Sequence, residues 1–157
     1  MELEFGGGHI SVTGAIHYSS GVKRSKVVGL LLHVGINEYP AEVIVDTGAP
    51  FLVCTPQLAQ AMGVEDLVPL LRANILYRGI WLEGNIYTLT VAFAADDNMG
   101  TGISLRVQGF VPDVVDILDD ILPFSSLGWI SCLESIPFAI SRQAGLLLLL
   151  RKTHEGL

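Results

Sequence analysis

The sequence predicts a mainly β domain with one or two short helices. Half of the 157 residues are apolar and the mean hydropathy is +0.53, so the chain holds enough apolar side chains to fill a core. Short β-branched runs separated by Gly, Pro, Asn and Asp recur along most of the chain, whereas long helical periodicity is scarce. These two patterns favour strands that are connected by tight turns.

The first 26 residues are expected to form an extension that precedes the main domain at 27–157. Within the extension, residues 9–20 are a candidate strand pair with Gly14 inside it. Because three consecutive glycines end the segment 1–8, we expect that segment to be loosely held.

The main domain begins with a predicted β-hairpin. Residues 27–34 are almost entirely apolar, turn residues occupy 35–38, and β-branched residues return at 42–45. This hairpin ends at Asp46. A short helix is expected soon after it, because Thr55 suits an N-cap and the Pro that follows suits the first helical position.

The rest of the chain predicts further strands. Gly63 fits the left-handed residue that ends a helix, and residues 71–93 resemble a second hairpin with arms at 73–77 and 86–93. The remaining expected elements are a strand at 103–107, an acidic connection at 113–120, a short helix around 129–135, and strands at 138–141 and 146–150.

Charge and composition exclude several classes of function. The net charge is −7, and the only cluster of basic residues, Lys23, Arg24 and Lys26, lacks aromatic neighbours, which argues against nucleic-acid binding. The longest apolar stretch, 27–36, is far shorter than a membrane span, and the N-terminus lacks the pattern of a secretory signal. We therefore expect a cytoplasmic protein that does not bind membranes.

Neither a metal nor another cofactor is expected. Cys54 and Cys132 lie far apart among apolar residues, which predicts two buried free thiols rather than a disulfide or a zinc site. The four histidines have no spacing typical of metal ligands.

A candidate catalytic residue follows the first hairpin. The β-branched run at 43–45 leads directly into Asp46, Thr47 and Gly48. An Asp-Thr-Gly tripeptide arises by chance in about one chain of this length in ten, so the strand before it and the strand and capped helix after it carry the prediction. In such a turn the glycine lets backbone N–H groups approach the carboxylate. The alternative is an aspartate that merely stabilises a turn.

A carboxylate in this position is suited to peptide hydrolysis by activated water. Two carboxylates pressed together share one proton, so one accepts a proton from water while the other donates to the carbonyl oxygen. Only one Asp-Thr/Ser-Gly occurs in the chain, and the simplest second carboxylate is Asp46 of a second chain across a two-fold axis. We therefore expect that activity requires a homodimer and that the substrate is a peptide or protein.

The segment Asp46-Thr47-Gly48-Ala49 matches the active-site motif of the retropepsin-like aspartic proteases, the single-domain relatives of pepsin and of retroviral proteases. The resemblance covers about four-fifths of the chain. It includes Ser126-Leu127-Gly128, which is similar to the family's apolar-apolar-Gly element, and residues 133–140, which are similar to bacterial members. It implies a closed β-barrel of the acid-protease type with Asp46 as the catalytic residue. The supporting residues that it implies are Thr47, Gly48, Ala49 and Gly128.

The resemblance also identifies residues 78–84 as the tip of the flap, the hairpin that closes over the substrate. The substrate-binding residues expected there are Gly79, Trp81, Leu82 and Gly84. An apolar pair such as Trp81 and Leu82 is equally suited to cover the core or a dimer interface. Ser126 departs from the family pattern, in which two apolar residues precede the glycine.

Two hypotheses follow from these residues. The first is an aspartic endopeptidase that holds an extended peptide between its dyad and its flaps, with the substrate main chain added as a β-strand. The alternative is a non-catalytic peptide-binding or assembly module that keeps the fold but forms no working dyad. The two differ in whether a hydroxyl-bearing transition-state mimic binds more tightly than its peptide counterpart.

Overall fold

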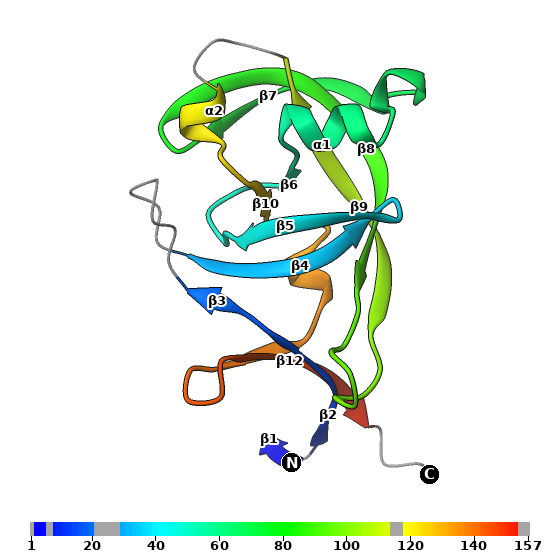
Figure 1. The fold of residues 1–157 in the computed structure, drawn as a ribbon, viewed down its shortest axis with the longest axis vertical. Coiled ribbons are helices and arrows are strands. Elements are labelled where there is room, and N and C mark those ends of the chain that lie inside the picture. The colour runs from blue at the N-terminus through cyan, green and yellow to red at the C-terminus, as the bar shows by residue number, and fades with distance from the viewer. Residues whose placement is uncertain (1, 6–7, 21–28, 114–117, 154–157) are drawn as a thin grey trace.

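The computed structural model describes residues 2–5, 8–20, 29–113 and 118–153, and it is mainly β, as predicted (Figure 1). The strands are β1 (Glu2–Phe5), β2 (Gly8–His17), β3 (Ser19–Ser20), β4 (Leu30–Ile36), β5 (Tyr39–Val45), β6 (Leu52–Val53), β7 (Leu71–Tyr77), β8 (Ile80–Phe93), β9 (Ile103–Pro112), β10 (Ser125–Leu127), β11 (Phe138–Ser141) and β12 (Leu146–Thr153). The helices are α1 (Pro56–Ala61) and α2 (Leu118–Ile121), with 3₁₀ turns at Val64–Asp66 and Leu133–Ser135.

Six strands close into a barrel. The larger sheet has the order β3-β4-β5-β10-β6-β9-β8-β7. An additional pairing of β4 with β8 closes the run β4-β5-β10-β6-β9-β8 into a ring. The main core cluster includes Leu32, Ile36 and Val91, none of which is accessible to solvent. The predicted closed β-barrel is thus confirmed, and closure leaves few strand edges exposed.

The first hairpin forms as the sequence predicts. Strands β4 and β5 pair from Leu30 and Val45 up to a two-residue turn at Asn37 and Glu38, both with positive φ. This turn geometry matches the right-handed twist of the strands. The first two residues of the predicted strand, 27 and 28, lie outside the described residues, and the strand extends to Ile36.

Helix α1 confirms the predicted cap residues. Thr55 has extended backbone angles, and its Oγ1 accepts a hydrogen bond from the Leu58 N–H at 3.2 Å. Pro56 occupies the start of the helix, and Gly63, with a φ of 65°, follows its end. Cys54, at the start of this connection, is a buried free thiol, and burial raises its pKa to about 12.

Strand β10 lies between β5 and β6 and pairs with both. Leu127 pairs in parallel with Val45, and Ser126 pairs in antiparallel fashion with Val53. The chain reaches this position through α2, which replaces part of the acidic connection expected at 113–120. Leu122, which follows α2, is buried.

A second sheet has the order β1-β2-β12-β11 (Figure 1). The predicted strand pair within 9–20 is wrong, because β2 continues straight through Gly14. This glycine is needed for a close approach rather than a turn, since a Cβ there would lie 2.3 Å from the Thr101 carbonyl oxygen. Strand β1 pairs with β2, so residues 2–5 are held in the sheet rather than loosely attached. The division at residue 26 stays a prediction.

The C-terminal strands form as expected, but the helix predicted around 129–135 does not. Residues 129–132 form turns, and only Leu133–Ser135 is a 3₁₀ turn. Ser131 has a φ of 59°, a left-handed conformation that a regular helix cannot contain. Cys132, the second buried free thiol, also has a pKa raised to about 12 by burial. None of the described helices is long and apolar enough to cross a bilayer.

Candidate active site

Asp46 lies directly after β5, where the chain turns. Its backbone N–H donates to the Leu127 carbonyl oxygen at 3.0 Å, which ties the residue to β10. Its Oδ1 accepts a hydrogen bond from the Gly48 N–H at 3.0 Å, as the glycine in the motif predicts. Only 26% of the side chain is exposed. The turn therefore fixes one carboxylate oxygen and leaves Oδ2 available for other contacts.

The rest of the motif has two kinds of environment. Thr47 and Gly48 are exposed, whereas Ala49 is buried. A Cβ at Gly48 would lie 3.3 Å from Asp46 Oδ1, so a larger residue would crowd the carboxylate. The exposed half of the turn faces away from the core.

Gly128 lies against this turn, although it is far away in the sequence. The two residues after it donate hydrogen bonds to the carbonyl oxygens of Ala49 and Pro50, at 2.9 and 2.8 Å. A Cβ at Gly128 would lie 2.0 Å from the carbonyl oxygen of Phe51. The structure thus brings Asp46, Ala49 and Gly128 together, and the contact distance explains why only glycine fits.

The β7–β8 hairpin ends over the carboxylate. Its turn consists of Arg78 and Gly79, which have φ values of 50° and 80°. Arg78 Nη2 lies 3.6 Å from Asp46 Oδ2, and the guanidinium also lies over the Tyr77 ring, 5.1 Å from its centroid. Sequence reasoning did not single out Arg78, although it placed the residue in the flap.

The expected flap residues are distributed differently from the prediction. A two-residue turn lets β8 resume at Ile80, so Trp81, Leu82 and Gly84 belong to a strand rather than to the tip. Trp81 is 68% exposed, whereas Leu82 is only 4% exposed and packs in the core. Gly84 packs against β9, since a Cβ there would lie 2.2 Å from the Val111 carbonyl oxygen. Substrate contact by Gly79 and Trp81 stays a prediction.

The inner face of the hairpin is bound to β10 by a buried hydrogen bond. The Tyr77 hydroxyl lies 2.6 Å from Ser126 Oγ, and the two side chains are almost completely buried. Ser126 is the residue that departs from the apolar family pattern, and this bond gives its hydroxyl a partner. Burial raises the pKa of Tyr77 above its usual value.

A second core cluster packs beneath the hairpin. It joins residues of β7 and β8 to Ala49 in the turn, and its buried members are Ala49, Val53, Ile75, Tyr77, Leu82, Ile86, Phe110 and Leu122. The cluster excludes water from the side of the turn that faces the barrel. The hairpin is therefore an integral wall of the site in the single chain.

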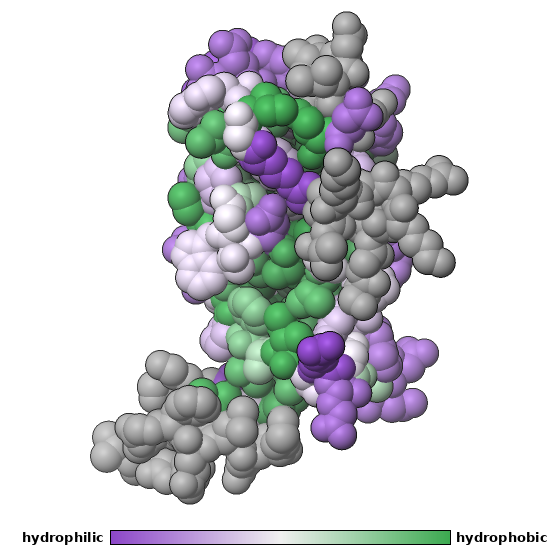
Figure 2. All heavy atoms as spheres, turned by 90° about the vertical axis from the view of Figure 1, so that its left-hand side faces the viewer, coloured by the Kyte–Doolittle hydropathy of each residue, from purple (hydrophilic) through white to green (hydrophobic). Residues whose placement is uncertain are grey.

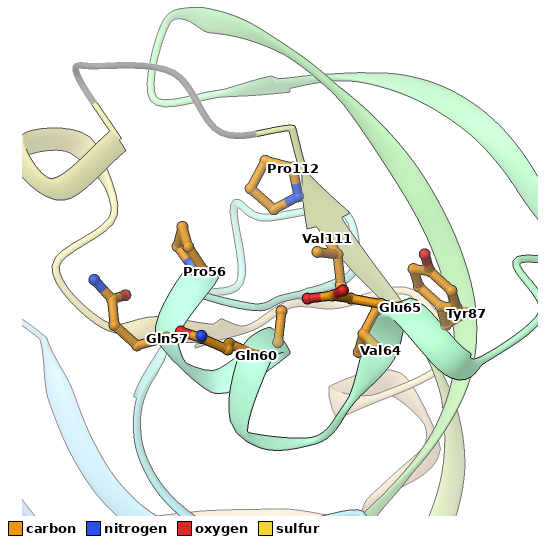
Figure 3. A pocket seen from close by; sticks show the side chains of 9 residues that line it. Pro56, Gln57, Gln60, Val64, Glu65, Tyr87, Val111 and Pro112 are labelled. Carbon is orange, nitrogen blue, oxygen red and sulfur yellow. The ribbon is translucent and has the colours of Figure 1, made fainter.

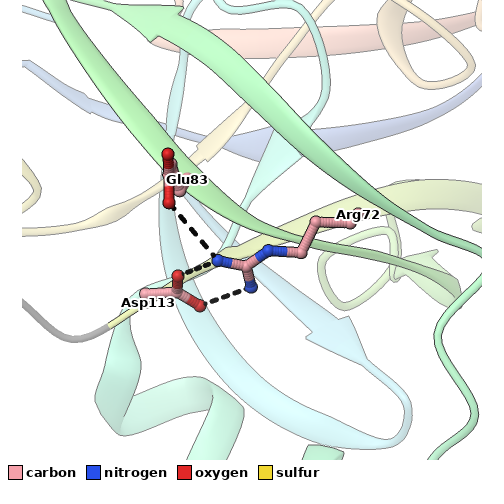
Figure 4. Close-up of polar contacts among 3 residues, drawn as sticks. All are labelled: Arg72, Glu83 and Asp113. Atoms are coloured by element: carbon pink, nitrogen blue, oxygen red, sulfur yellow. Dashed lines mark hydrogen bonds and ion pairs between the residues drawn. The ribbon is translucent and has the colours of Figure 1, made fainter.

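The base of the hairpin is held by an ion-pair cluster (Figure 4). Arg72 on β7 donates to both carboxylate oxygens of Asp113, one of them at 2.8 Å, and its Nη2 lies 3.6 Å from Glu83 Oε2. The hydrogen bonds from Arg72 lower the pKa of Asp113 below its usual range. The cluster links β7 and β8 to the end of β9.

A separate groove of about 400 Å³ lies between α1 and the barrel (Figure 3). Its walls come from α1, the following 3₁₀ turn, β8 and β9, and its lining residues are Pro56, Gln57, Ala59, Gln60, Val64, Glu65, Tyr87, Val111 and Pro112. None of the predicted site residues lines it. Within the described ranges, no group of three His, Cys, Asp or Glu side chains is arranged to hold a metal ion.

Comparison with known proteins supports the fold. No protein-family model matches the chain, and no curated protein does. Among solved structures, it is similar to a retropepsin-like aspartic protease from Rickettsia conorii, with a TM-score of 0.53 and 23% sequence identity. The match covers 94% of this chain and 98% of that one. The predicted retropepsin-like fold is thus confirmed, and a likeness at this identity establishes the fold alone.

Proposed function

We propose that this protein is an aspartic endopeptidase of the retropepsin type, in which two copies of the chain each contribute Asp46 to one catalytic dyad. The observation that carries the proposal is the position of Asp46. It lies at the end of β5 in a retropepsin-like barrel, in a turn that β10 fixes through the Leu127 carbonyl oxygen. This arrangement holds the Asp46 carboxylate rigidly at the end of β5, beneath the tip of the β7–β8 hairpin.

The need for a second chain follows from the contacts of Asp46. In the described part of one chain, the hydrogen bond and ion pair of its side chain go to Gly48 and Arg78, and neither partner is a carboxylate. A shared proton requires two carboxylates. A two-fold axis beside the exposed half of the turn would bring two copies of Asp46 together, with Thr47 from each chain next to the pair.

Exposed apolar side chains support a second copy of this chain as the partner. Figure 2 shows the side of the molecule where the β7–β8 hairpin ends, and apolar surface runs down the middle of that side. After Gly128, Trp129 and Ile130 are 45% and 44% exposed, and Ile140 on the edge strand β11 is 44% exposed. Such residues are suited to an interface between two chains.

The proposed reaction is the hydrolysis of a peptide bond. The ionised Asp46 takes a proton from a water molecule, whose oxygen attacks the carbonyl carbon, while the protonated Asp46 of the second chain donates its proton to the carbonyl oxygen. The tetrahedral gem-diol then collapses and the C–N bond breaks: the Asp46 that took the water proton donates it to the amine nitrogen, and the Asp46 carboxylate of the second chain accepts a proton from a gem-diol hydroxyl, which restores the shared-proton dyad. An extended substrate lies between the dyad and the hairpins, with Gly79 and Trp81 as the proposed contacts.

A cleavage assay with matched variants tests the proposal. Purified protein at about pH 5 is incubated with a mixed peptide library, and products are identified by mass spectrometry. We expect Asp46→Asn to abolish cleavage while keeping the Gly48 hydrogen bond, because Asn Oδ1 remains an acceptor. Full activity in that variant would refute the proposal. The rate should also be bell-shaped with pH on the acidic side of neutrality, and a flat profile from pH 4 to 8 would contradict a shared-proton dyad.

The alternative function, a peptide-binding or assembly module, is favoured by one observation. Arg78 pairs with Asp46 in the single chain, so the carboxylate contacts a cation there rather than a second carboxylate. Sedimentation equilibrium distinguishes the two functions, because a protein that stays monomeric at high concentration would lack the dyad. Equal binding of a peptide and its hydroxyl-bearing mimic would also favour the module.

A further inference from the structure

We propose that Arg78 is an autoinhibitory residue, which closes the hairpin tip over Asp46 in the single chain and must leave before a peptide can be cleaved. The proposal rests on the proposed function of Asp46. Three observations support it: the contact between the two side chains, the carboxylate oxygen that the contact occupies, and the way in which the hairpin tip is held.

The contact joins two side chains that are largely removed from solvent. Arg78 is 25% exposed and Asp46 is 26% exposed, and their charged atoms lie 3.6 Å apart. The Tyr77 ring supports the guanidinium from beneath, and Tyr77 is itself held by Ser126. A cation in this position is therefore fixed on two sides rather than free to move on the surface.

Arg78 occupies the oxygen that catalysis would need. Asp46 Oδ1 accepts the Gly48 N–H, so Oδ2 is the oxygen left to accept a proton from water. Arg78 Nη2 lies 3.6 Å from Oδ2, so a water molecule that approaches this oxygen must compete with the guanidinium.

The hairpin is built to open at its tip while its base stays in place. A Cβ at Gly79 would meet no atom within 4 Å, and Trp81 is 68% exposed, so the contacts that hold the two-residue turn are mainly those of Arg78. The base, in contrast, is fixed by Arg72, which binds both Asp113 and Glu83. Loss of the Arg78 contact would thus release the turn at Arg78 and Gly79, while the Tyr77–Ser126 hydrogen bond and the barrel stay in place.

Limited digestion with trypsin tests the contact without relying on peptidase activity. Trypsin cleaves after Arg78 only when the tip opens, and exposed Arg142 in the β11–β12 turn is an internal reference. We expect Asp46→Asn to increase cleavage at Arg78 relative to Arg142 by about twofold to fivefold. An unchanged or smaller ratio would overturn the proposal. Thermal unfolding of the variant serves as the control for a general loss of stability.

Peptide cleavage then tests inhibition. We expect Arg78→Gln to raise kcat/KM by about threefold or more, whereas Arg78→Lys keeps a cation and stays near the unsubstituted protein. Arg142→Gln is the matched surface control. A lower kcat/KM with a higher KM in Arg78→Gln would make Arg78 a substrate-binding residue and overturn the proposal. Faster trypsin cleavage in Asp46→Asn without peptide cleavage by any variant would instead refute the proposed function and leave the closed tip established.

Discussion

Two regions meet at the Asp46 carboxylate, and they are built in different ways. The turn at 46–51 is held by main-chain hydrogen bonds to the segment 127–130. The hairpin tip is held by side chains, through the Tyr77–Ser126 hydrogen bond and the Arg78–Asp46 ion pair. Main-chain contacts do not depend on which side chains are present, whereas the tip depends on individual residues. The turn is therefore a constant part of the site, and the tip is the part that substitutions can tune.

The largest loss of stability is expected from a substitution that disrupts the turn. Gly128→Ala would place a methyl group 2.0 Å from the Phe51 carbonyl oxygen, and the atoms it meets are backbone atoms that cannot rotate away. We expect a loss of about 3 kcal/mol or more in the free energy of unfolding. Chemical denaturation measures this loss. A change below about 1 kcal/mol would show that the turn is less rigid than its main-chain contacts indicate.

The next largest loss is expected from substitutions that remove the Tyr77–Ser126 hydrogen bond near the tip. Tyr77→Phe and Ser126→Ala each remove the buried hydrogen bond between the two hydroxyl groups, so each should cost about 1 to 2 kcal/mol. The double variant should cost less than the sum of the two, because both remove one bond. Additive losses in a double-mutant cycle would contradict the assigned hydrogen bond.

The buried Tyr77 hydroxyl should also make the free energy of unfolding depend on pH. Because burial raises its pKa in the folded protein, the folded state holds this proton more tightly than the unfolded chain does. The resulting stability is complete below about pH 10 and is lost as the pH rises through the folded-state pKa. The stability difference between the unsubstituted protein and Tyr77→Phe, measured from pH 8 to 11, should shrink at the alkaline end. A constant difference would refute the shift.

A smaller effect is expected at the glycine of the tip. Gly79→Ala meets no atom within 4 Å, but it must adopt a φ of 80°. We expect a loss of about 1 kcal/mol, clearly less than for Gly128→Ala. The matched pair thus separates lack of space from backbone strain. An equal loss in thermal unfolding would show that the tip is packed as tightly as the turn.

The smallest effect is expected at the base of the hairpin. Arg72→Gln removes the partner that lowers the pKa of Asp113, and all the side chains involved are well exposed. A lowered folded-state pKa contributes stability above the usual aspartate value, and this contribution disappears as the pH falls through the lowered value. The variant should therefore be slightly less stable at pH 7 and equal to the unsubstituted protein near pH 2. A difference that persists in acid denaturation would point to lost packing instead.

The sequence predicts the turn far better than the tip, for a physical reason. Asp46, Gly48 and the capped helix α1 depend on local spacing and on residues with strong backbone preferences. The Tyr77–Ser126 and Arg78–Asp46 contacts join residues that are distant in the chain, and no local pattern records such pairs. Ser126, which stands where the family pattern has an apolar residue, is the one signal in the sequence that could have indicated a buried polar partner.

The two errors in the predicted fold also arise from contacts between distant parts of the chain. Gly14 signals a turn by its residue type, yet it serves the close approach of the segment around Thr101. The helix predicted around 129–135 is replaced by turns, because Ser131 adopts a left-handed conformation shortly after Gly128. In each case a tertiary contact overrides a local preference.

The position of β10 also determines when the site can exist during synthesis. Leu127 pairs with Val45 although most of the domain lies between them in the chain, so the ribosome must release nearly all of the barrel before the Asp46 turn gains its support. A growing chain carries the Asp-Thr-Gly motif for most of its synthesis without the completed site. A chain that ends before β10 would retain the motif, yet its carboxylate would have no fixed position.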